Sequence, residues 1–188
     1  VDAVADRIKQ AHGKLDMLIN SAGLNTPKRR WRDIDDESWN RVIDVDLTGA
    51  FNVSHAALLM MRAQRDGLIV NVSSMASQKV GGVSGVAYTT AKTALNAMNE
   101  SINHENCHLG ILACALCPGE VATEILDLRP VPPSPEDRAK MVQEEDVGRT
   151  ILFIATMPAH VCLNEIHITP TWNRGYIGAA DHIFNRED

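Results

Sequence analysis

The sequence predicts an α/β fold: a doubly wound parallel sheet with helices on both of its faces. The first observation is that short apolar segments alternate with longer segments of helical periodicity, which is typical of strands joined by crossover helices. The second is size and composition. The chain has 188 residues, of which 45% are hydrophobic and 4% aromatic, so a single domain over residues 1–188 can form around an aliphatic core.

The elements follow one another in a regular order. Apolar segments of strand length lie at residues 15–20, 68–72, 111–117 and 164–169. Helical patterns lie at residues 1–11, at about 37–65, and at 88–104 and 146–156. The loops expected between them are residues 25–32, 73–87 and 128–135, of which the last is rich in proline.

Charge and composition exclude several classes of protein. The formal net charge of -6 offers no basic footprint for nucleic acid or for an anionic membrane surface. No apolar run reaches the roughly eighteen residues that a membrane-spanning helix needs, and the first residues do not resemble a signal peptide. Nothing about the four cysteines suggests secretion, so we expect reduced thiols in a cytoplasmic protein.

Cys114 and Cys117 have a Cys-x-x-Cys spacing that also occurs in redox and metal sites. A redox pair normally exposes its first cysteine at a helix start, whereas these two lie in a predicted strand. We therefore interpret them as small core residues. The seven histidines show no metal-ligand spacing, so we expect no metal site.

Tyr88 and Lys92 are four residues apart on a predicted helix and share one face of it. A free tyrosine has a pKa of about 10, but a neighbouring ammonium group favours the phenolate and lowers that pKa. The pair can thus serve as a general acid and base. Taken alone, the spacing favours a half-buried tyrosine beside a solvated lysine, and it is the surroundings that favour the catalytic interpretation.

Three consecutive predicted strands end in small or hydrogen-bonding residues. Residues 20–23 follow the first, Ser73 and Ser74 follow the second, and Pro118 and Gly119 form a turn after the third. In open parallel sheets, ligands bind beyond the carboxyl ends of the strands. Three such endings at one edge, with Tyr88 beside them, indicate a binding site.

These motifs, in this order, resemble the short-chain dehydrogenase/reductase family, and the likeness covers nearly the whole chain. It implies a Rossmann-like fold in three layers and an NAD(P)-dependent oxidoreductase that interconverts an alcohol and a carbonyl by hydride transfer. Tyr88 would carry the substrate's proton, Lys92 would lower its pKa, and Ser74 would bind the substrate oxygen, with Ser73 as a close alternative. The residues implied in cofactor binding are Asn20, Ala22, Gly23, Tyr88, Lys92, Pro118, Gly119, Val121 and Thr123.

One catalytic position departs from the family pattern. The family usually carries an asparagine that holds a water in a proton relay behind the lysine, and this chain has Asp46 there. An ionised aspartate accepts hydrogen bonds but donates none. Asp46 could hold the same water or could change the pH profile of the reaction, and both interpretations stay open.

A second departure concerns the cofactor's pyrophosphate. The family begins with a strand and a glycine-rich turn that bind this group, and no such glycine pattern occurs in the sequence. We therefore expect an N-terminally truncated form of the fold, its C-terminal two-thirds, with half of a cofactor site for NAD or NADP. The alternative function is a non-catalytic remnant that keeps the fold and its oligomer contacts.

The resemblance also implies partners. These are a small alcohol or carbonyl substrate and further copies of the chain, because family members commonly pair through the helices predicted at residues 37–65 and 88–104. A homodimer or homotetramer is therefore expected. The loops at residues 81–87 and 128–135 should shape the substrate pocket, and the last strand resembles family members that act on small polar alcohols.

Overall fold

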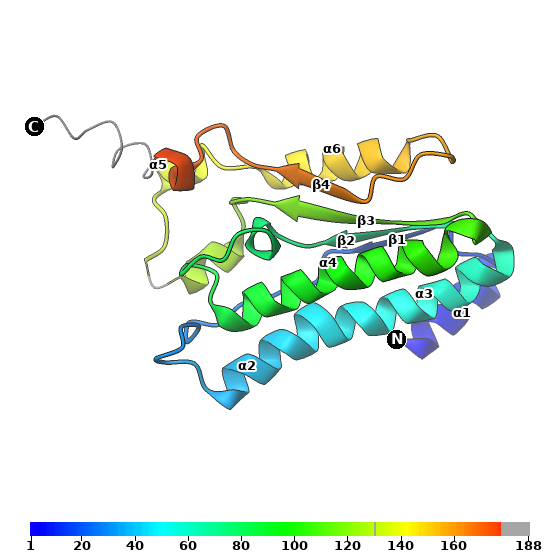
Figure 1. Ribbon diagram of the computed structural model, residues 1–188, viewed down its shortest axis with the longest axis horizontal. Helices are drawn as coiled ribbons and strands as arrows, with labels where there is room; N and C mark the ends of the chain where they lie inside the picture. The colour runs from blue at the N-terminus through cyan, green and yellow to red at the C-terminus, as the bar shows by residue number, and fades with distance from the viewer. Residues whose placement is uncertain (130, 178–188) are drawn as a thin grey trace, which may run out of the picture.

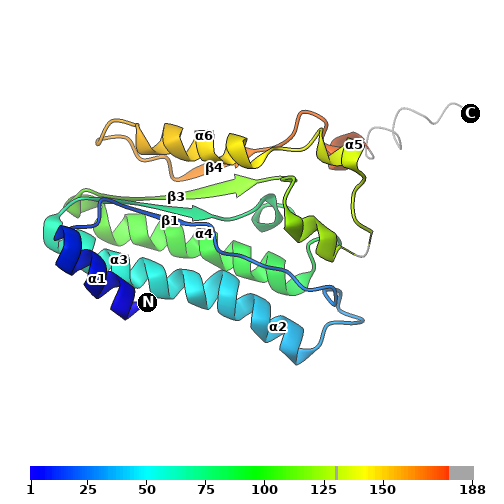
Figure 2. The same ribbon diagram turned by 180° about the vertical axis from the view of Figure 1, so that it is seen from behind.

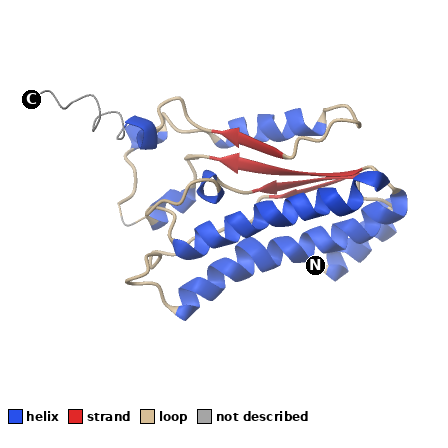
Figure 3. Cartoon of the chain, in the orientation of Figure 1, coloured by secondary structure: helices blue, strands red, loops and turns tan. Residues whose placement is uncertain are grey.

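The computed structural model describes residues 1–129 and 131–177 and contains a four-stranded parallel sheet. The strands lie side by side in sequence order and point the same way (Figure 3). They are β1 (Met17–Asn20), β2 (Gly67–Val72), β3 (Ile111–Pro118) and β4 (Glu165–Ile168). Every predicted strand is thus confirmed, with ends that differ by at most two residues from those predicted.

Helices cover both faces of the sheet. α1 (Asp2–His12), α3 (Ala50–Gln64) and α4 (Val86–Asn106) lie against one face, and α6 (Glu144–Ala155) lies against the other (Figures 1 and 2). This three-layer, doubly wound arrangement is the predicted fold class. The short helix α5 (Pro135–Arg138) begins at the end of the predicted loop 128–135, in which residue 130 lies outside the described part of the chain.

The helix predicted over residues 37–65 is continuous but irregular. Its first part, α2 (Asp36–Ile43), begins after Asp35, whose side chain accepts a hydrogen bond from the Ser38 backbone N–H at 2.9 Å. Between α2 and α3, residues Asp44–Gly49 form a π-helical segment with a wider turn. Periodicity did not predict this segment, which carries Asp46.

Two hydrophobic clusters hold the layers together. One lies between the sheet and helices α3 and α4, and the other lies between the sheet and α6. The first contains Ala57, Met61, Ile69, Ile102, Ile111 and Ala113, and the second contains Val70, Cys114, Leu116 and Ile154. Neither cluster contains an aromatic ring, as the composition predicted. Their burial fixes α4, and with it Tyr88 and Lys92, against the sheet.

α4 begins at Val86, two residues earlier than predicted, directly after Gly85. Gly85 has a φ of 80°, in the left-handed region that favours glycine. A Cβ added there would lie 2.5 Å from both Cβ and the backbone oxygen of Arg29. The Val86 N–H donates to the same Arg29 carbonyl at 3.1 Å. The loop around Arg29 therefore defines where α4 begins.

Cys114 and Cys117 are both buried in β3, as predicted, and all four cysteines are free thiols. The two face opposite sides of the sheet. Cys114 packs in the cluster under α6, whereas the Cys117 sulfur lies 3.5 Å from the side-chain nitrogen of Asn96 in α4. They therefore do not form a redox pair. In the described ranges, no helix has the length and apolar character needed to cross a membrane.

Candidate active site

The C-terminal ends of β1, β2 and β3 form one edge of the sheet. The strands are parallel, with Asn20 opposite Asn71 and Val72 opposite Leu116. The segments that follow them, residues 20–23, 73–74 and 118–123, therefore leave the sheet at the same edge, as the sequence predicted. This edge is where the candidate catalytic side chains of α4 meet the strands.

Lys92 is almost completely buried, with 3% of its surface exposed. Its Nζ donates a hydrogen bond to the Val72 carbonyl oxygen at 3.1 Å and lies 3.4 Å from Oδ2 of Asp46. The same ammonium group lies 5.5 Å from the centre of the Tyr88 ring. Lys92 thus links the end of β2, the π-helical segment and Tyr88.

Asp46 is the direct ionic partner of Lys92. It is 1% exposed, and its Oδ1 accepts a hydrogen bond from the Leu24 backbone N–H at 2.8 Å. Burial raises the pKa of Asp46, while the charge of Lys92 and the Leu24 N–H oppose that shift. Burial likewise lowers the pKa of Lys92, and Asp46 opposes it. Each charge therefore offsets part of the desolvation of the other, and burial determines the direction of both shifts.

The pKa of Tyr88 differs from the expectation. The residue as a whole is half-buried, but burial raises the pKa of its hydroxyl to about 12. A hydrogen bond with Ser74 lowers this pKa, and the negative charge of Asp46 raises it further. We expected Lys92 to lower the pKa below its ordinary value. That expectation was wrong, because burial of the hydroxyl outweighs the groups that favour its ionised form. The resting hydroxyl is therefore protonated at neutral pH.

Ser73 and Ser74 have different partners. The Ser73 hydroxyl is buried and donates to the Lys92 carbonyl oxygen at 3.2 Å. The Ser74 hydroxyl is half-buried, accepts the Ala76 N–H at 3.1 Å and lies close enough to Tyr88 to lower the pKa of that residue. Of the two serines that the sequence left open, Ser74 is the one beside the tyrosine.

The turn after β1 packs closely over the lysine. A Cβ on Gly23 would lie 3.2 Å from Nζ of Lys92 and 3.3 Å from Oδ2 of Asp46. Ala22 and Gly23 are exposed, whereas Asn20 is buried and its side-chain nitrogen donates to Oδ1 of Asn71 at 3.0 Å. Asn20 therefore anchors the turn, and the two small residues present their backbone to solvent.

The segment after β3 is held on two sides. Pro118 is buried as the last residue of β3, and the Gly119 N–H donates at 2.7 Å to a backbone carbonyl of β4. Val121 pairs with Val142 in an isolated β-bridge, and both Val121 and Thr123 are half-buried. The residues expected to contact the nicotinamide amide thus belong to an anchored segment rather than a free loop.

Sequence reasoning missed two arginines at this edge. The Arg29 side chain is buried and donates to three backbone carbonyls, one in its own loop and two in segments far along the chain, at 2.7, 3.1 and 2.7 Å; the acceptors are those of Thr26, Val83 and Leu128. Arg129 lies close enough to Tyr88 to lower its pKa, and it donates to Glu120 at 2.6 Å. Their partners are distant in sequence or belong to the backbone, so no local spacing marks them.

Comparison with known proteins decides the family. The profile of short chain dehydrogenases matches residues 1–130 of the chain. The chain belongs to the short-chain dehydrogenase family. The resemblance that the motifs predicted is thereby confirmed.

Curated relatives of this short-chain dehydrogenase include a reductase and an oxidoreductase. It is 34% identical over 164 residues to an acetoacetyl-CoA reductase of Rhizobium meliloti, an alignment that covers 83% of this chain and 66% of the relative. It is 30% identical over 170 residues to an uncharacterized oxidoreductase of Staphylococcus aureus, which covers 90% of this chain and 71% of the relative. The chain thus spans about two thirds of the length of the first of these relatives.

Solved structures share its fold. An alcohol dehydrogenase from the archaeon Thermococcus sibiricus, complexed with 5-hydroxy-NADP, superposes with a TM-score of 0.79 at 21% identity. The superposition covers 92% of this chain and 70% of the dehydrogenase chain. The closed form of a serine dehydrogenase complexed with NADP+ gives a TM-score of 0.78 at 22% identity, over 90% of this chain and 72% of the serine dehydrogenase chain. This likeness confirms the Rossmann-like fold class.

Proposed function

We propose that the protein is an NAD(P)-dependent oxidoreductase that interconverts an alcohol and a carbonyl compound, with Tyr88 as proton donor and acceptor. The observation that carries the proposal is the position of the Tyr88 ring next to the buried Lys92 ammonium and the Ser74 hydroxyl. Membership of the short-chain dehydrogenase family supports it.

The residues at this edge fit a nicotinamide cofactor. NAD or NADP, when bound, supplies or accepts the hydride. Gly23 lets the exposed turn after β1 lie close to Nζ of Lys92, where a larger residue would crowd the lysine. In a cofactor bound along this turn, Lys92 would be the donor to a ribose hydroxyl. Ala22 and the anchored segment 118–123 would complete the binding surface. The similar folds solved with NADP+ and 5-hydroxy-NADP support this cofactor class.

The side chains divide the proton chemistry among them. In carbonyl reduction, Ser74 donates a hydrogen bond to the substrate oxygen, and the Tyr88 hydroxyl transfers its proton to that oxygen. Lys92 then stabilises the negative charge left on the tyrosine, while Asp46 keeps the ammonium group in place. In alcohol oxidation the proton returns from the substrate hydroxyl to Tyr88.

We propose a small polar alcohol or carbonyl compound as the substrate. Arg29 joins the loops at Val83 and Leu128, which would form opposite walls of the pocket. The names of two similar solved structures, an alcohol dehydrogenase and a serine dehydrogenase, are consistent with this substrate class, whereas the substrate named for the acetoacetyl-CoA reductase is larger.

The assembly and location that we propose are a homodimer or homotetramer in the cytoplasm. Phe51 and Leu59 on α3 are 52% and 63% exposed, which leaves apolar surface for a partner subunit on the helix expected to mediate pairing. The four free thiols are compatible with a reducing compartment.

Nicotinamide absorbance provides the test. The complete protein is supplied with NADH or NADPH and a panel of small ketones and keto acids, and cofactor oxidation is followed. Ser74→Ala should lower kcat/KM by roughly 10²- to 10³-fold, because a donor to the developing oxyanion is lost. The matched control, Ser73→Ala, removes a hydroxyl that donates to the Lys92 backbone and should leave kcat/KM within a few-fold.

Two outcomes would contradict the proposal. No turnover of the complete, folded protein with either cofactor would favour the alternative, a non-catalytic protein that keeps the fold and its oligomer contacts. Equal losses from the two serine variants would contradict the role assigned to Ser74.

A further inference from the structure

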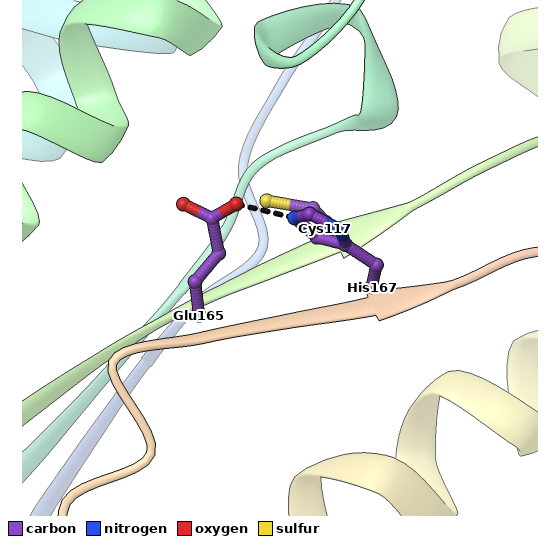
Figure 4. Close-up of side chains that lie close together, drawn as sticks. All are labelled: Cys117, Glu165 and His167. Carbon is purple, nitrogen blue, oxygen red and sulfur yellow. Dashed lines mark hydrogen bonds and ion pairs between the residues drawn. The ribbon is translucent and has the colours of Figure 1, made fainter.

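A second cluster of reactive side chains lies where β3 and β4 pair. Cys117 in β3 is directly opposite His167 in β4, and Glu165 is two residues earlier on the same face of β4 (Figure 4). The Cys117 sulfur, a Glu165 carboxylate oxygen and a His167 ring nitrogen all lie within 4.8 Å of one another. Strand pairing thus brings together three donor atoms of different kinds on a rigid part of the fold.

We propose that Cys117, Glu165 and His167 bind a divalent transition-metal ion, for which Zn²⁺ is the best match. Thiolate sulfur, imidazole nitrogen and carboxylate oxygen are the donors that Zn²⁺ takes in proteins, whereas Mg²⁺ and Ca²⁺ prefer oxygen ligands alone. Three protein ligands leave one position of a tetrahedral ion for water. On binding, the Cys117 S–H bond breaks, a sulfur–metal bond forms and the proton passes to solvent.

Neighbouring side chains hold the donors in place. The side-chain nitrogen of Asn96 in α4 donates to Oε2 of Glu165 at 3.0 Å and to the Cys117 sulfur at 3.5 Å. Gln78 donates to the other carboxylate oxygen, Oε1, at 2.5 Å. Such second contacts orient metal ligands in known sites and contribute to affinity.

The charge of the cluster suits a cation. In the part of the chain that the structure describes, the ionic partner of Glu165 is His167, and no lysine or arginine pairs with it. A neutral His167 would leave the carboxylate uncompensated next to a buried thiol. A dication would offset both the carboxylate and the thiolate formed on binding. The competing explanation for the cluster is that Glu165 and His167 form an ion pair with each other, next to a neutral Cys117 thiol that only fills the core.

The location gives the ion a structural task. β4 is the last strand of the described sheet, and the ion would tie it to β3 at the point where Pro118 begins the segment 118–123. Spacing along the chain predicted no such site, because the cysteine and the other two ligands lie on strands that are distant in sequence. This inference does not depend on the proposed function.

Co²⁺ and Zn²⁺ titrations test the proposal. The full chain is treated with a chelator, dialysed and titrated with each ion, by absorbance for Co²⁺ and by calorimetry for Zn²⁺. We expect one equivalent to bind, with a thiolate-to-Co²⁺ charge-transfer band. Cys117→Ser should abolish that band, and His167→Gln should weaken affinity by more than about 100-fold, since loss of a second contact alone costs 10- to 100-fold. Asn96→Ala should weaken it about 10-fold.

The matched control is the double variant Cys107→Ser, His108→Gln, which removes an exposed cysteine and a neighbouring exposed histidine before the first residue of β3, at the opposite end of that strand from Cys117. It should bind both ions like the parent. Absence of stoichiometric binding by the folded parent would overturn the proposal, as would a charge-transfer band that persists in Cys117→Ser or disappears in the control. Because His167 is partly exposed, His167→Gln should fold, and unchanged Zn²⁺ affinity in that variant would equally overturn it.

Discussion

At the scale of single residues, two buried charges define the surroundings of Tyr88. Lys92 lies 5.5 Å from the centre of the ring, and Asp46 lies 3.4 Å from the lysine nitrogen. The relation of Tyr88 to Lys92 could be predicted from sequence, because both residues lie on one face of one helix. The direct contact of Asp46 could not, because it depends on how the π-helical segment packs against α4.

Asp46→Asn should lower the apparent pKa that governs alcohol oxidation. The carboxylate raises the pKa of Tyr88, so replacing it with a neutral amide of similar size lowers that pKa. Oxidation needs the deprotonated tyrosine and should therefore extend to lower pH. The shift belongs to the coupled group of Tyr88, Lys92 and position 46 rather than to one residue.

The measurement is the pH profile of kcat/KM for alcohol oxidation in the parent and in Asp46→Asn. The parent itself serves as the reference, assayed with the same alcohol and cofactor. An apparent pKa that stays unchanged or rises would mean that Asp46 acts by holding Lys92 or a water in position, and its charge would have no part in tuning the tyrosine.

At the scale of elements, the start of α4 is defined by a close contact. Gly85 adopts a left-handed conformation directly against Arg29, and Arg29 joins its own loop to the segments at Val83 and Leu128 through backbone carbonyls. The position of Tyr88 follows from this contact, since it lies in the first turn of α4. The sequence predicted the helix but not its first residue, because the contact involves a loop far earlier in the chain.

Gly85→Ala should destabilise the protein by about 3 kcal/mol. The alanine would have to adopt a strained backbone conformation, and its Cβ would clash with the Arg29 backbone. Gly82→Ala is the matched control in the same loop, because a Cβ there would meet no atom within 4 Å. Urea unfolding measures both variants. A similar loss of unfolding free energy in the two variants, or a loss below about 1 kcal/mol in Gly85→Ala, would contradict a close contact between Gly85 and Arg29.

At the scale of the whole molecule, a chain of buried amides crosses the sheet. The Asn20 side chain donates to Asn71 at 3.0 Å, Asn71 donates to Asn99 at 3.2 Å, and Asn99 donates to the Asn164 carbonyl at 3.5 Å. These residues connect β1, β2, α4 and the segment before β4. This series of hydrogen bonds thus connects the candidate active site, at the end of β1, to the β4 side of the sheet.

Asn71→Ala should cost about 2–6 kcal/mol of unfolding free energy. It leaves a donor on Asn20 and an acceptor on Asn99 unpaired in the interior, and each such group costs roughly 1–3 kcal/mol. Asn52→Ala, on an exposed position of α3, is the control and should change stability by less than about 0.5 kcal/mol. Denaturant unfolding measures the free energy of unfolding of each variant, and the two values can be compared if the dependence on denaturant concentration is the same. Equal free energies for Asn71→Ala and Asn52→Ala would contradict a structural role for the buried amides.

The four strands, the helices on both faces and the shared edge at Asn20, Ser74 and Pro118 could all be predicted from sequence. Apolar runs and turn residues encode them locally. The features that sequence could not predict arise between distant segments. They are the ion pair of Asp46, the loop contacts of Arg29 and the meeting of Cys117 with β4. Each depends on side chains that only the folded sheet brings together.

The central claim is that the Tyr88 hydroxyl carries the substrate's proton, and the most direct measurement is turnover and cofactor binding of Tyr88→Phe in the complete protein. Phenylalanine keeps the ring beside Lys92 and removes the oxygen. The account predicts that kcat falls by roughly 10³-fold or more while the dissociation constant of the nicotinamide cofactor stays within a few-fold. Turnover within a few-fold of the parent would contradict it.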